Sequence, residues 1–256
     1  MRVGRSDATF VAPRRRSLLA VAMALVVVAG VISFVPGRSA AESVNWADGL
    51  TALVSVNSDG TDAGNGDSMM SWAFYPSQEL LPAFSADGTK IAFVSRASDL
   101  DPTIEPWDPQ AAGGNVYVRD LTTGVTTLVS VSASGGPSSG FSAVLSPDGS
   151  KVAFLSSSSD LDAGVVDTNG EIDIYVRDLE AGVTSLVTVN SSGTAAGNAP
   201  SECTPSFSPD GSLITFSSFA TDLDDSIPVR QGAQIYVRDL EQGMTRLVSI
   251  NSSGDA

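Results

Sequence analysis

The segment FSPDGSLITFS, residues 207–217, combines a tight turn with an apolar run. A Pro-Asp pair followed by Gly favours a type I turn closed by a left-handed glycine, which joins two antiparallel strands. Related turns occur at residues 85–88 and 146–149, so that Asp87, Asp148 and Asp210 lie 61 and 62 positions apart. The chain therefore repeats with a period near sixty residues. We expect Gly149 and Gly211 to adopt the left-handed conformation.

Three other elements recur with the turn. Apolar runs follow it at 91–95, 152–156 and 213–217, the string YVRDL begins at Tyr117, Tyr175 and Tyr236, and LVSV-type strings begin at residues 53, 128, 186 and 247. Each repeat is interpreted as four strands. Their β-branched, aromatic and nearly continuous apolar content is typical of sheets covered on both faces. The chain after residue 41 is predicted to be all-β.

The order FSPDG, apolar strand, YVRDL and LVSVNSSG resembles the TolB-type, WD-repeat-like β-propeller repeat of exported bacterial proteins. The resemblance covers about residues 51–256 and implies four-stranded antiparallel blades, with repeats near 58–131, 132–189 and 190–250. It is specific for the fold and uninformative about function. Such repeats serve as binding scaffolds, as periplasmic partners and as appendages to enzymes.

The repeat count predicts an incomplete propeller. The chain holds three full repeats plus one leading strand, Thr51 to Asn57, whereas closed propellers usually have about four to eight blades. Either the sequence is a piece of a longer protein, which we favour, or two copies form a six-bladed ring. Three blades on their own leave two open sheet faces and an unpaired leading strand, which make self-association through the open propeller edges possible.

The N-terminus is typical of an export signal. Arg14, Arg15 and Arg16 precede a mostly apolar stretch, 18–35, which is followed by Pro36 and the small residues 39–41. We expect residues 1–41 to be a signal peptide cleaved after Ala41, and residues 42–256 to be secreted or periplasmic. Residues 15–19 also resemble a twin-arginine signal. The alternative is an uncleaved membrane anchor.

Charge restricts the classes of partner. The whole chain carries −15, but six of its 14 basic residues and only one of its 29 acidic residues precede residue 42. The remainder has 8 basic and 28 acidic residues, a net charge of −20. Such a surface repels phosphate backbones and anionic lipids, so we expect no nucleic-acid or peripheral membrane binding. The one cysteine, Cys203, is expected to be a buried, inert thiol.

Binding is expected on one face of the propeller. In an antiparallel four-stranded blade, the second-to-third loops and the blade-to-blade links lie opposite the tight turns. The long loops 99–114, 159–171 and 222–233 meet there, and loops on a rigid scaffold commonly carry function. The candidate binding residues are Asp99, Asp101, Asp108, Asp160, Asp162, Asp222, Asp224 and Asp225. The alternative is a solvated acidic rim that maintains solubility.

One loop offers weak candidates for a metal site. Asp167, Asn169 and Asp173 surround Gly170 with oxygen ligands of the kind that calcium needs. The spacing departs from the calcium-loop pattern, and the other repeats lack the motif. An Asx-rich turn is the favoured interpretation, and we expect no cofactor.

Catalysis is disfavoured by composition. The chain contains no His, which excludes a Ser-His-Asp triad, its Cys-His counterparts and histidine metal centres. Arg119, Arg177 and Arg238 recur at one place in every repeat, as expected for a structural contact rather than for a substrate clamp. We predict a non-catalytic scaffold that binds an unknown protein or small ligand. The alternative is the propeller part of a larger hydrolase or protease whose catalytic domain is missing.

Overall fold

The computed structural model describes the backbone of 23–28 and 31–36, and residues 51–68, 81–104, 114–228 and 232–254. β1 (Met23–Val28) and β2 (Val31–Pro36), which lie within the predicted signal peptide, pair as an antiparallel hairpin. The predicted cleavage site and Asp108 lie outside the described residues. Among the described residues, no helix has the length and apolarity needed to span a bilayer.

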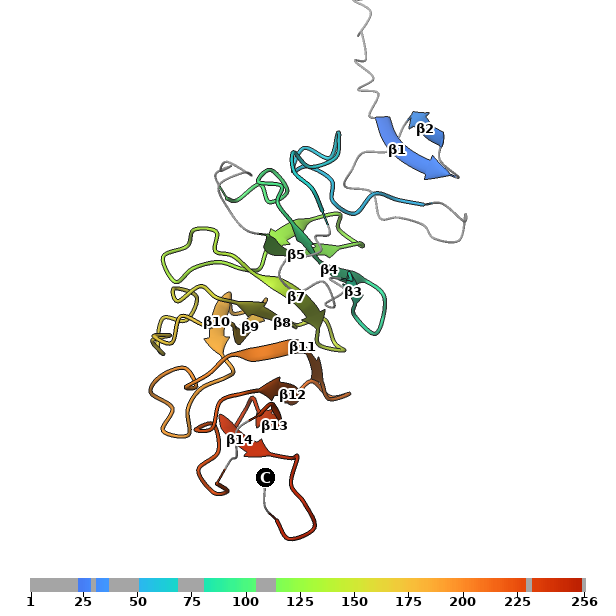
Figure 1. Ribbon diagram of the computed structural model, residues 1–256. Helices are drawn as coiled ribbons and strands as arrows, with labels where there is room; N and C mark the ends of the chain where they lie inside the picture. Colours follow the sequence, from blue (N-terminus) through green and yellow to red (C-terminus); the bar gives the residue numbers. More distant parts are fainter. Residues whose placement is uncertain are drawn as a thin grey trace, which may run out of the picture.

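Three four-stranded antiparallel sheets follow one another along the chain (Figure 1). The first blade contains β3 (Ala83–Phe84), β4 (Lys90–Ser95), β5 (Asn115–Asp120) and β6 (Thr126–Leu128). The second contains β7 (Phe141–Leu145), β8 (Lys151–Ser156), β9 (Asp173–Asp178) and β10 (Val183–Leu186). The third contains β11 (Ser201–Phe207), β12 (Leu213–Ser218), β13 (Gln234–Asp239) and β14 (Met244–Leu247). The predicted all-β propeller with four-stranded blades is confirmed, and it is unclosed.

The repeated aromatic residues explain the pairing of the two central strands. In every blade a Phe on the second strand lies directly opposite the Tyr of YVRDL, as in Phe154 and Tyr175, and the rings stack at 5.8–6.0 Å between centroids. These Tyr side chains are completely buried, and each hydroxyl donates a hydrogen bond to a backbone carbonyl of the long loop that precedes its strand. The tyrosine therefore fills the core without leaving its polar group unpaired.

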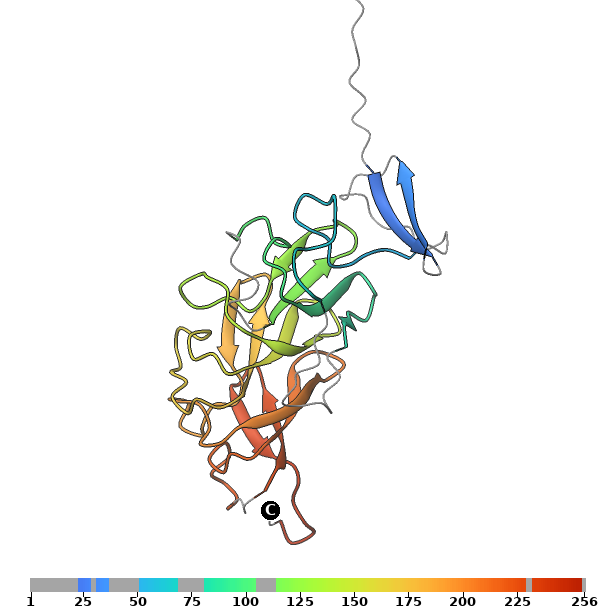
Figure 2. The ribbon, with the colours of Figure 1, turned by 45° about the horizontal axis from the view of Figure 1, so that its top comes forward.

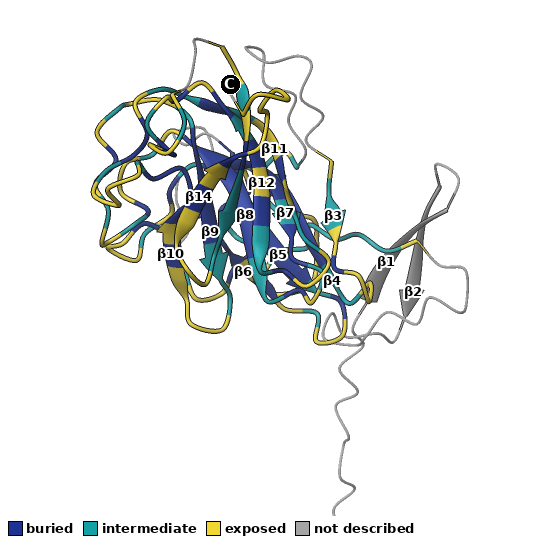
Figure 3. Ribbon diagram, turned by 90° about the horizontal axis from the view of Figure 1, so that it is seen from below, coloured by how far each residue is buried: buried dark blue, intermediate teal, exposed yellow. Residues whose placement is uncertain are grey.

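The blades bury their sheet faces against each other. We call the face toward the preceding repeat the leading face and the opposite one the trailing face. The trailing face of the first blade, with Val94 and Val116, packs on the leading face of the second, with Phe154 and Tyr175. The trailing face of the second packs in the same way on the third. The innermost strand β7 lies beside both β3 and β11 (Figure 2). Buried residues are concentrated in the central strands, and exposed residues lie in the turns, in parts of the loops and on the outermost strands (Figure 3).

The SPDG-type turns form as expected. Gly149 and Gly211 have φ of +67° and +72°, which confirms their left-handed conformation. In the third blade the Gly211 N–H donates to the Ser208 carbonyl, and the Ser208 hydroxyl donates to Asp210. The predicted pairing of the segment around Phe207 with Leu213–Ser217 is also confirmed.

The prediction of a leading strand at 51–57 is wrong. Val56 forms an isolated bridge to Ala63, and the segment forms no strand in the structure. Val54 instead packs on the buried cluster that contains Phe93 and Tyr117, so the leading face of the first blade is covered. Of the two predicted open faces, the described residues leave one, the trailing face of the third blade.

The prediction of a buried thiol is also wrong, because Cys203 is exposed. The pairing register of β11 shifts between Glu202 and Ser206, and Cys203 has φ +69° within this irregularity. Residues inside such a bulge leave the regular alternation of the ladder, so the thiol is not held against the covered face.

Candidate functional site

The predicted acidic loops share a repeated motif, Asp-Leu-Asp, at 99–101, 160–162 and 222–224. The central leucine is buried in every copy. The carboxylate of the second Asp accepts a hydrogen bond from a backbone N–H on the outermost strand of the same blade. The donors are Leu128 to Asp101 at 2.7 Å, Leu186 to Asp162 at 2.7 Å and Leu247 to Asp224 at 2.9 Å. These carboxylates therefore fasten the long loop to the edge strand of its own blade.

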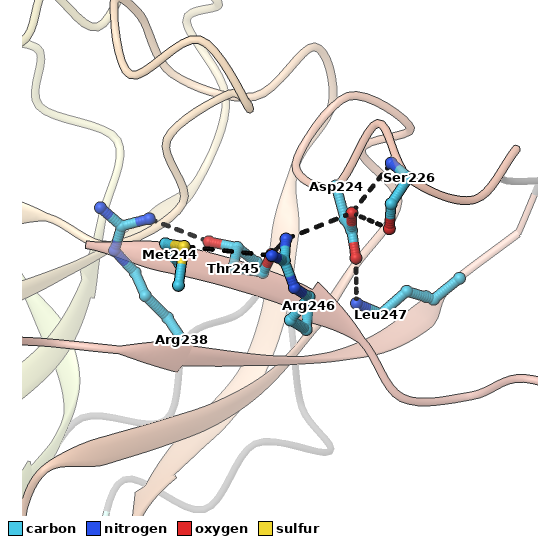
Figure 4. Close-up of polar contacts among 7 residues, drawn as sticks. All are labelled: Asp224, Ser226, Arg238, Met244, Thr245, Arg246 and Leu247. Carbon is cyan, nitrogen blue, oxygen red and sulfur yellow. Dashed lines mark hydrogen bonds and ion pairs between the residues drawn. The ribbon is translucent and has the colours of Figure 1, made fainter. Parts of the chain in front are cut away.

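The second oxygen of these carboxylates accepts hydrogen bonds from within the long loop itself. In the third blade Asp224 Oδ1 accepts the N–H and the hydroxyl of Ser226 (Figure 4). Arg246 adds an ion pair at 3.7 Å, but its side chain is 61% exposed, so this pair contributes little. Although burial opposes ionisation, the hydrogen bonds from Ser226 and Leu247 keep the pKa of Asp224 below its ordinary value. The carboxylate is therefore ionised at neutral pH.

The first Asp of each motif connects the loop to the link that enters the blade. The carbonyls of Asp99, Asp160 and Asp222 accept the N–H groups of Ser58, Ala133 and Ser191. Their carboxylates accept the backbone N–H of Asn65 at 2.9 Å, the Ser138 hydroxyl at 2.8 Å and the backbone N–H of Asn198 at 3.0 Å. Each long loop is therefore tied to a link loop on the same side of the propeller.

The structure thus brings seven of the eight predicted binding residues to one face, and six of them hold the loops in place. Asp225 is exposed and accepts no hydrogen bond from the described residues. Sequence reasoning missed this structural role of the aspartates. The repetition of Asp-Leu-Asp in all three blades was the signal that could have identified it, because a periodic residue usually makes a periodic contact.

The face remains strongly acidic despite these hydrogen bonds. The link and long loops, residues 57–67, 96–104, 132–139, 157–171, 190–198 and 219–228, contain one basic residue, Arg96, within the described chain. Their acids are Asp59, Asp62, Asp67, Asp99, Asp101, Asp160, Asp162, Asp167, Glu171, Asp222, Asp224 and Asp225. Hydrogen bonds from neutral donors leave the charge of these carboxylates in place, so the face presents a concentrated negative potential.

The second blade adds a buried polar cluster at the weak metal candidates. Asn169 Nδ2 donates to Asp173 Oδ2 and to the Gly197 carbonyl, both at 2.8 Å, and the Tyr175 hydroxyl donates to Asp167 Oδ2 at 2.8 Å. The Thr188 hydroxyl donates to Asp173 Oδ1 at 2.6 Å. The oxygens that calcium would need are therefore directed at protein donors. Within the described residues, no group of three or more His, Cys, Asp or Glu is placed to hold a metal ion.

Burial makes Asp173 unusual in this cluster. Its side chain is completely buried, and desolvation raises its pKa to about 6, although hydrogen bonds from Thr188 and Asn169 oppose the shift. Desolvation together with the hydrogen bond to Asp167 also raises the pKa of the Tyr175 hydroxyl far above its ordinary range. The equivalent first residues of the other two third strands are neutral, Asn115 and Gln234. Of the three blades, only the second has a carboxylate at the first position of its third strand.

The repeated arginines make the same contact in every blade. Arg119, Arg177 and Arg238 donate through Nη1 to the hydroxyls of Thr126, Thr184 and Thr245 at 2.8–2.9 Å. Each threonine lies directly opposite its arginine on the neighbouring strand. The expected structural contact is present, with a threonine as partner rather than the adjacent aspartate.

Comparison with known proteins gives only distant similarities. No family model matches the sequence, and no curated protein matches it. Among solved structures, TolB from Acinetobacter baumannii has a TM-score of 0.39 and 22% identity, covering 69% of this chain and 33% of its own. The β-propeller domain of the Trilobed protease from Pyrococcus furiosus has a TM-score of 0.39 and 13% identity, and the match covers 71% of this chain and 42% of that domain's chain. The chain spans less than half of the length of either structure.

Proposed function

We propose that the chain is a non-catalytic, extracytoplasmic β-propeller scaffold that binds a positively charged partner through its acidic loop face. The observation that carries the proposal is the charge of that face, where twelve acidic residues of the described loops are accompanied by Arg96 alone. A protein segment or ligand with several positive charges is the complementary partner.

The hydrogen bonds of the loops support a binding role as well as a structural one. The Asp-Leu-Asp motifs tie each long loop to its own edge strand and to a neighbouring link. Loops held in this way lose little conformational entropy when a partner binds. The exposed acids Asp225 and Glu171, which lie on these fixed loops, are therefore presented in a constant arrangement.

Calorimetric titration with a heptalysine peptide tests the binding face. The double variant Glu171→Gln/Asp225→Asn removes two exposed charges from the loop face, and Glu180→Gln/Glu241→Gln removes two exposed charges from the opposite, tight-turn side. We expect the first variant to bind heptalysine about fivefold more weakly at low ionic strength and the second to change affinity by less than about twofold. Equal weakening in both variants, or no binding by the parent chain, contradicts the proposal.

The extracytoplasmic location rests on the basic and apolar N-terminal pattern. N-terminal sequencing of the product exported from an expressing bacterium tests it. The expected first residue is Glu42. Membrane-bound material that retains Met1 contradicts cleavage and supports the anchor.

A further inference from the structure

A buried arginine that has no acidic partner among the described residues lies at the outer edge of the first blade. Arg119 is 8% exposed, and its Nη1 donates to Thr126 Oγ1 at 2.8 Å. The ion pair between described residues is Arg246 with Asp224, so no described carboxylate oxygen lies within 4.0 Å of the Arg119 guanidinium. The adjacent Asp120 accepts the N–H groups of the following turn instead.

This arrangement leaves most of the guanidinium's donors available. A guanidinium carries five N–H donors in a planar fork, and one contact to a hydroxyl occupies one of them. A buried cation is normally paired with an acid, because desolvation without a counter-charge is costly. Burial accordingly lowers the pKa of Arg119. A ligand that supplies the missing negative charge would relieve this cost.

Arg119 lines a pocket of about 270 Å³. Its walls include the link turn 57–60, the loop residues Leu100 and Pro102, and Val125 of the hairpin turn. The apolar side chains suit a short aliphatic body, and the guanidinium suits a carboxylate, which it can bind through two parallel hydrogen bonds.

The other two arginines occupy equivalent places but different surroundings. Arg177 and Arg238 line grooves of about 380 and 410 Å³ between neighbouring blades, and both are less buried than Arg119. Arg238 also shares a smaller pocket with Arg246 and with two acids, Asp224 and Asp225. The pocket at Arg119 therefore combines the least exposed of the three arginines with the apolar side chains of Leu100, Pro102 and Val125.

The charge around the pocket restricts the anion. Asp59, an exposed acid on the link turn, lines the same pocket, and the whole chain carries −15. Like-charge repulsion grows with the charge of the ligand, so a single carboxylate is preferred to sulfate or phosphate. We propose that this pocket binds a small aliphatic carboxylate, held by Arg119 between Leu100, Pro102 and Val125.

Isotope-edited NMR titration of the full chain tests the site. The probes are butyrate, the tripeptide Ala-Ala-Ala with a free C-terminus, the same tripeptide amidated, and sulfate. We expect saturable shifts of the Gly124 and Thr126 amides with a probe that has a free carboxylate. Stronger binding of butyrate identifies a free small acid as the ligand class, and stronger binding of the free tripeptide identifies a peptide C-terminus. Equal binding of the amidated tripeptide, or tighter binding of sulfate, overturns the proposal.

Two variants and a matched control separate binding from folding. Arg119→Lys keeps the charge but loses the fork and is expected to weaken butyrate or tripeptide binding about tenfold, whereas Arg119→Met abolishes it. Arg96→Met removes an exposed arginine elsewhere and changes affinity by less than about twofold. Thermal unfolding confirms that each variant is folded. A folded Arg119→Lys chain that binds like the parent overturns the assignment.

Discussion

The second and third blades have the same strands but bury them differently. Ile174 and Val187 on the trailing face of the second blade are 0% and 1% exposed, whereas their equivalents on the third, Ile235 and Val248, are 45% and 50% exposed. The local pairing is the same in both blades. Burial on this face is therefore decided by the blade that follows, not by the strand itself.

The second and third blades also differ in one polar pair at the start of the third strand. The polar pair at the start of the third strand is Asp173 with Thr188 in the second blade and Gln234 with Ser249 in the third. The second blade, whose trailing face is covered, has the ionisable Asp173 at this position, and the third blade, whose trailing face is open, has the neutral Gln234. Desolvation raises the pKa of this buried carboxylate, so its ionisation opposes folding.

The largest expected effect tests the difference in burial. Ile174→Ala should lower the free energy of unfolding by about 3 kcal/mol, because it leaves a cavity between two packed blades. Ile235→Ala should lower it by less than about 1 kcal/mol, since this side chain is half exposed. Urea denaturation of the full chain measures both values. Similar losses in the two variants would show that the trailing face of the third blade is covered in solution, as it would be by self-association.

The next effect concerns Asp173 and pH. Its pKa is raised in the folded chain, so its contribution to stability is complete below the unfolded pKa near 4 and is lost as pH rises through about 6. Asp173→Asn reproduces the neutral residue of the first blade. It should make the chain more stable than the parent by about 2 kcal/mol at pH 7 and equally stable at pH 3.5.

Denaturation series at several pH values test this prediction. Gln234→Glu is the matched reverse change in the open blade, and its partly exposed position should make the pH dependence smaller. A parent chain whose stability does not fall between pH 4 and pH 7 relative to Asp173→Asn would show that Asp173 is ionised without cost.

A third effect tests the loop fastening. Asp162→Ala removes the acceptor of the Leu186, Gly164 and Val165 N–H groups and should cost about 2 kcal/mol. Asp225→Ala, which removes an exposed acid of the third blade, should change stability by less than about 0.5 kcal/mol. Hydrogen exchange at the Leu186 amide should accelerate in the first variant alone. Unchanged exchange there would mean that the carboxylate is not the anchor of the edge strand.

The smallest effect compares two turns. Gly88→Val should cost about 1 kcal/mol, because φ is +70° while the surrounding space is open. Gly149→Val should cost more, since a Cβ there lies 3.2 Å from Lys90 and Ser85 of the first blade. Thermal unfolding midpoints measure the difference. An unchanged midpoint in both variants would contradict the left-handed turn.

The local elements of this protein could be predicted from its sequence. The turn with Asp210 and Gly211, the pairing of YVRDL with the strand before it, and the four-stranded blade all depend on residues close together in the chain. Turn geometry and side-chain alternation specify such hairpins without help from distant residues. Three repeats of one pattern also indicated the propeller, because blades with the same pattern can stack and cover one another's faces.

Which groups are covered and which are free could be seen only in the folded chain. The segment with Val54 covers the first blade, and the Asp-Leu-Asp carboxylates accept backbone N–H groups of the edge strands; both features depend on contacts between segments that are separated in the chain. The exposure of Cys203 depends on a bulge that the sequence pattern did not indicate. A sequence shows where the aspartates are. Whether their carboxylate oxygens remain free to bind a ligand depends on which N–H groups the fold brings within hydrogen-bond distance. The same holds for Arg119. Its repetition indicated a structural contact, while only the packed blade showed that the residue is buried with no acid of the described chain paired to it.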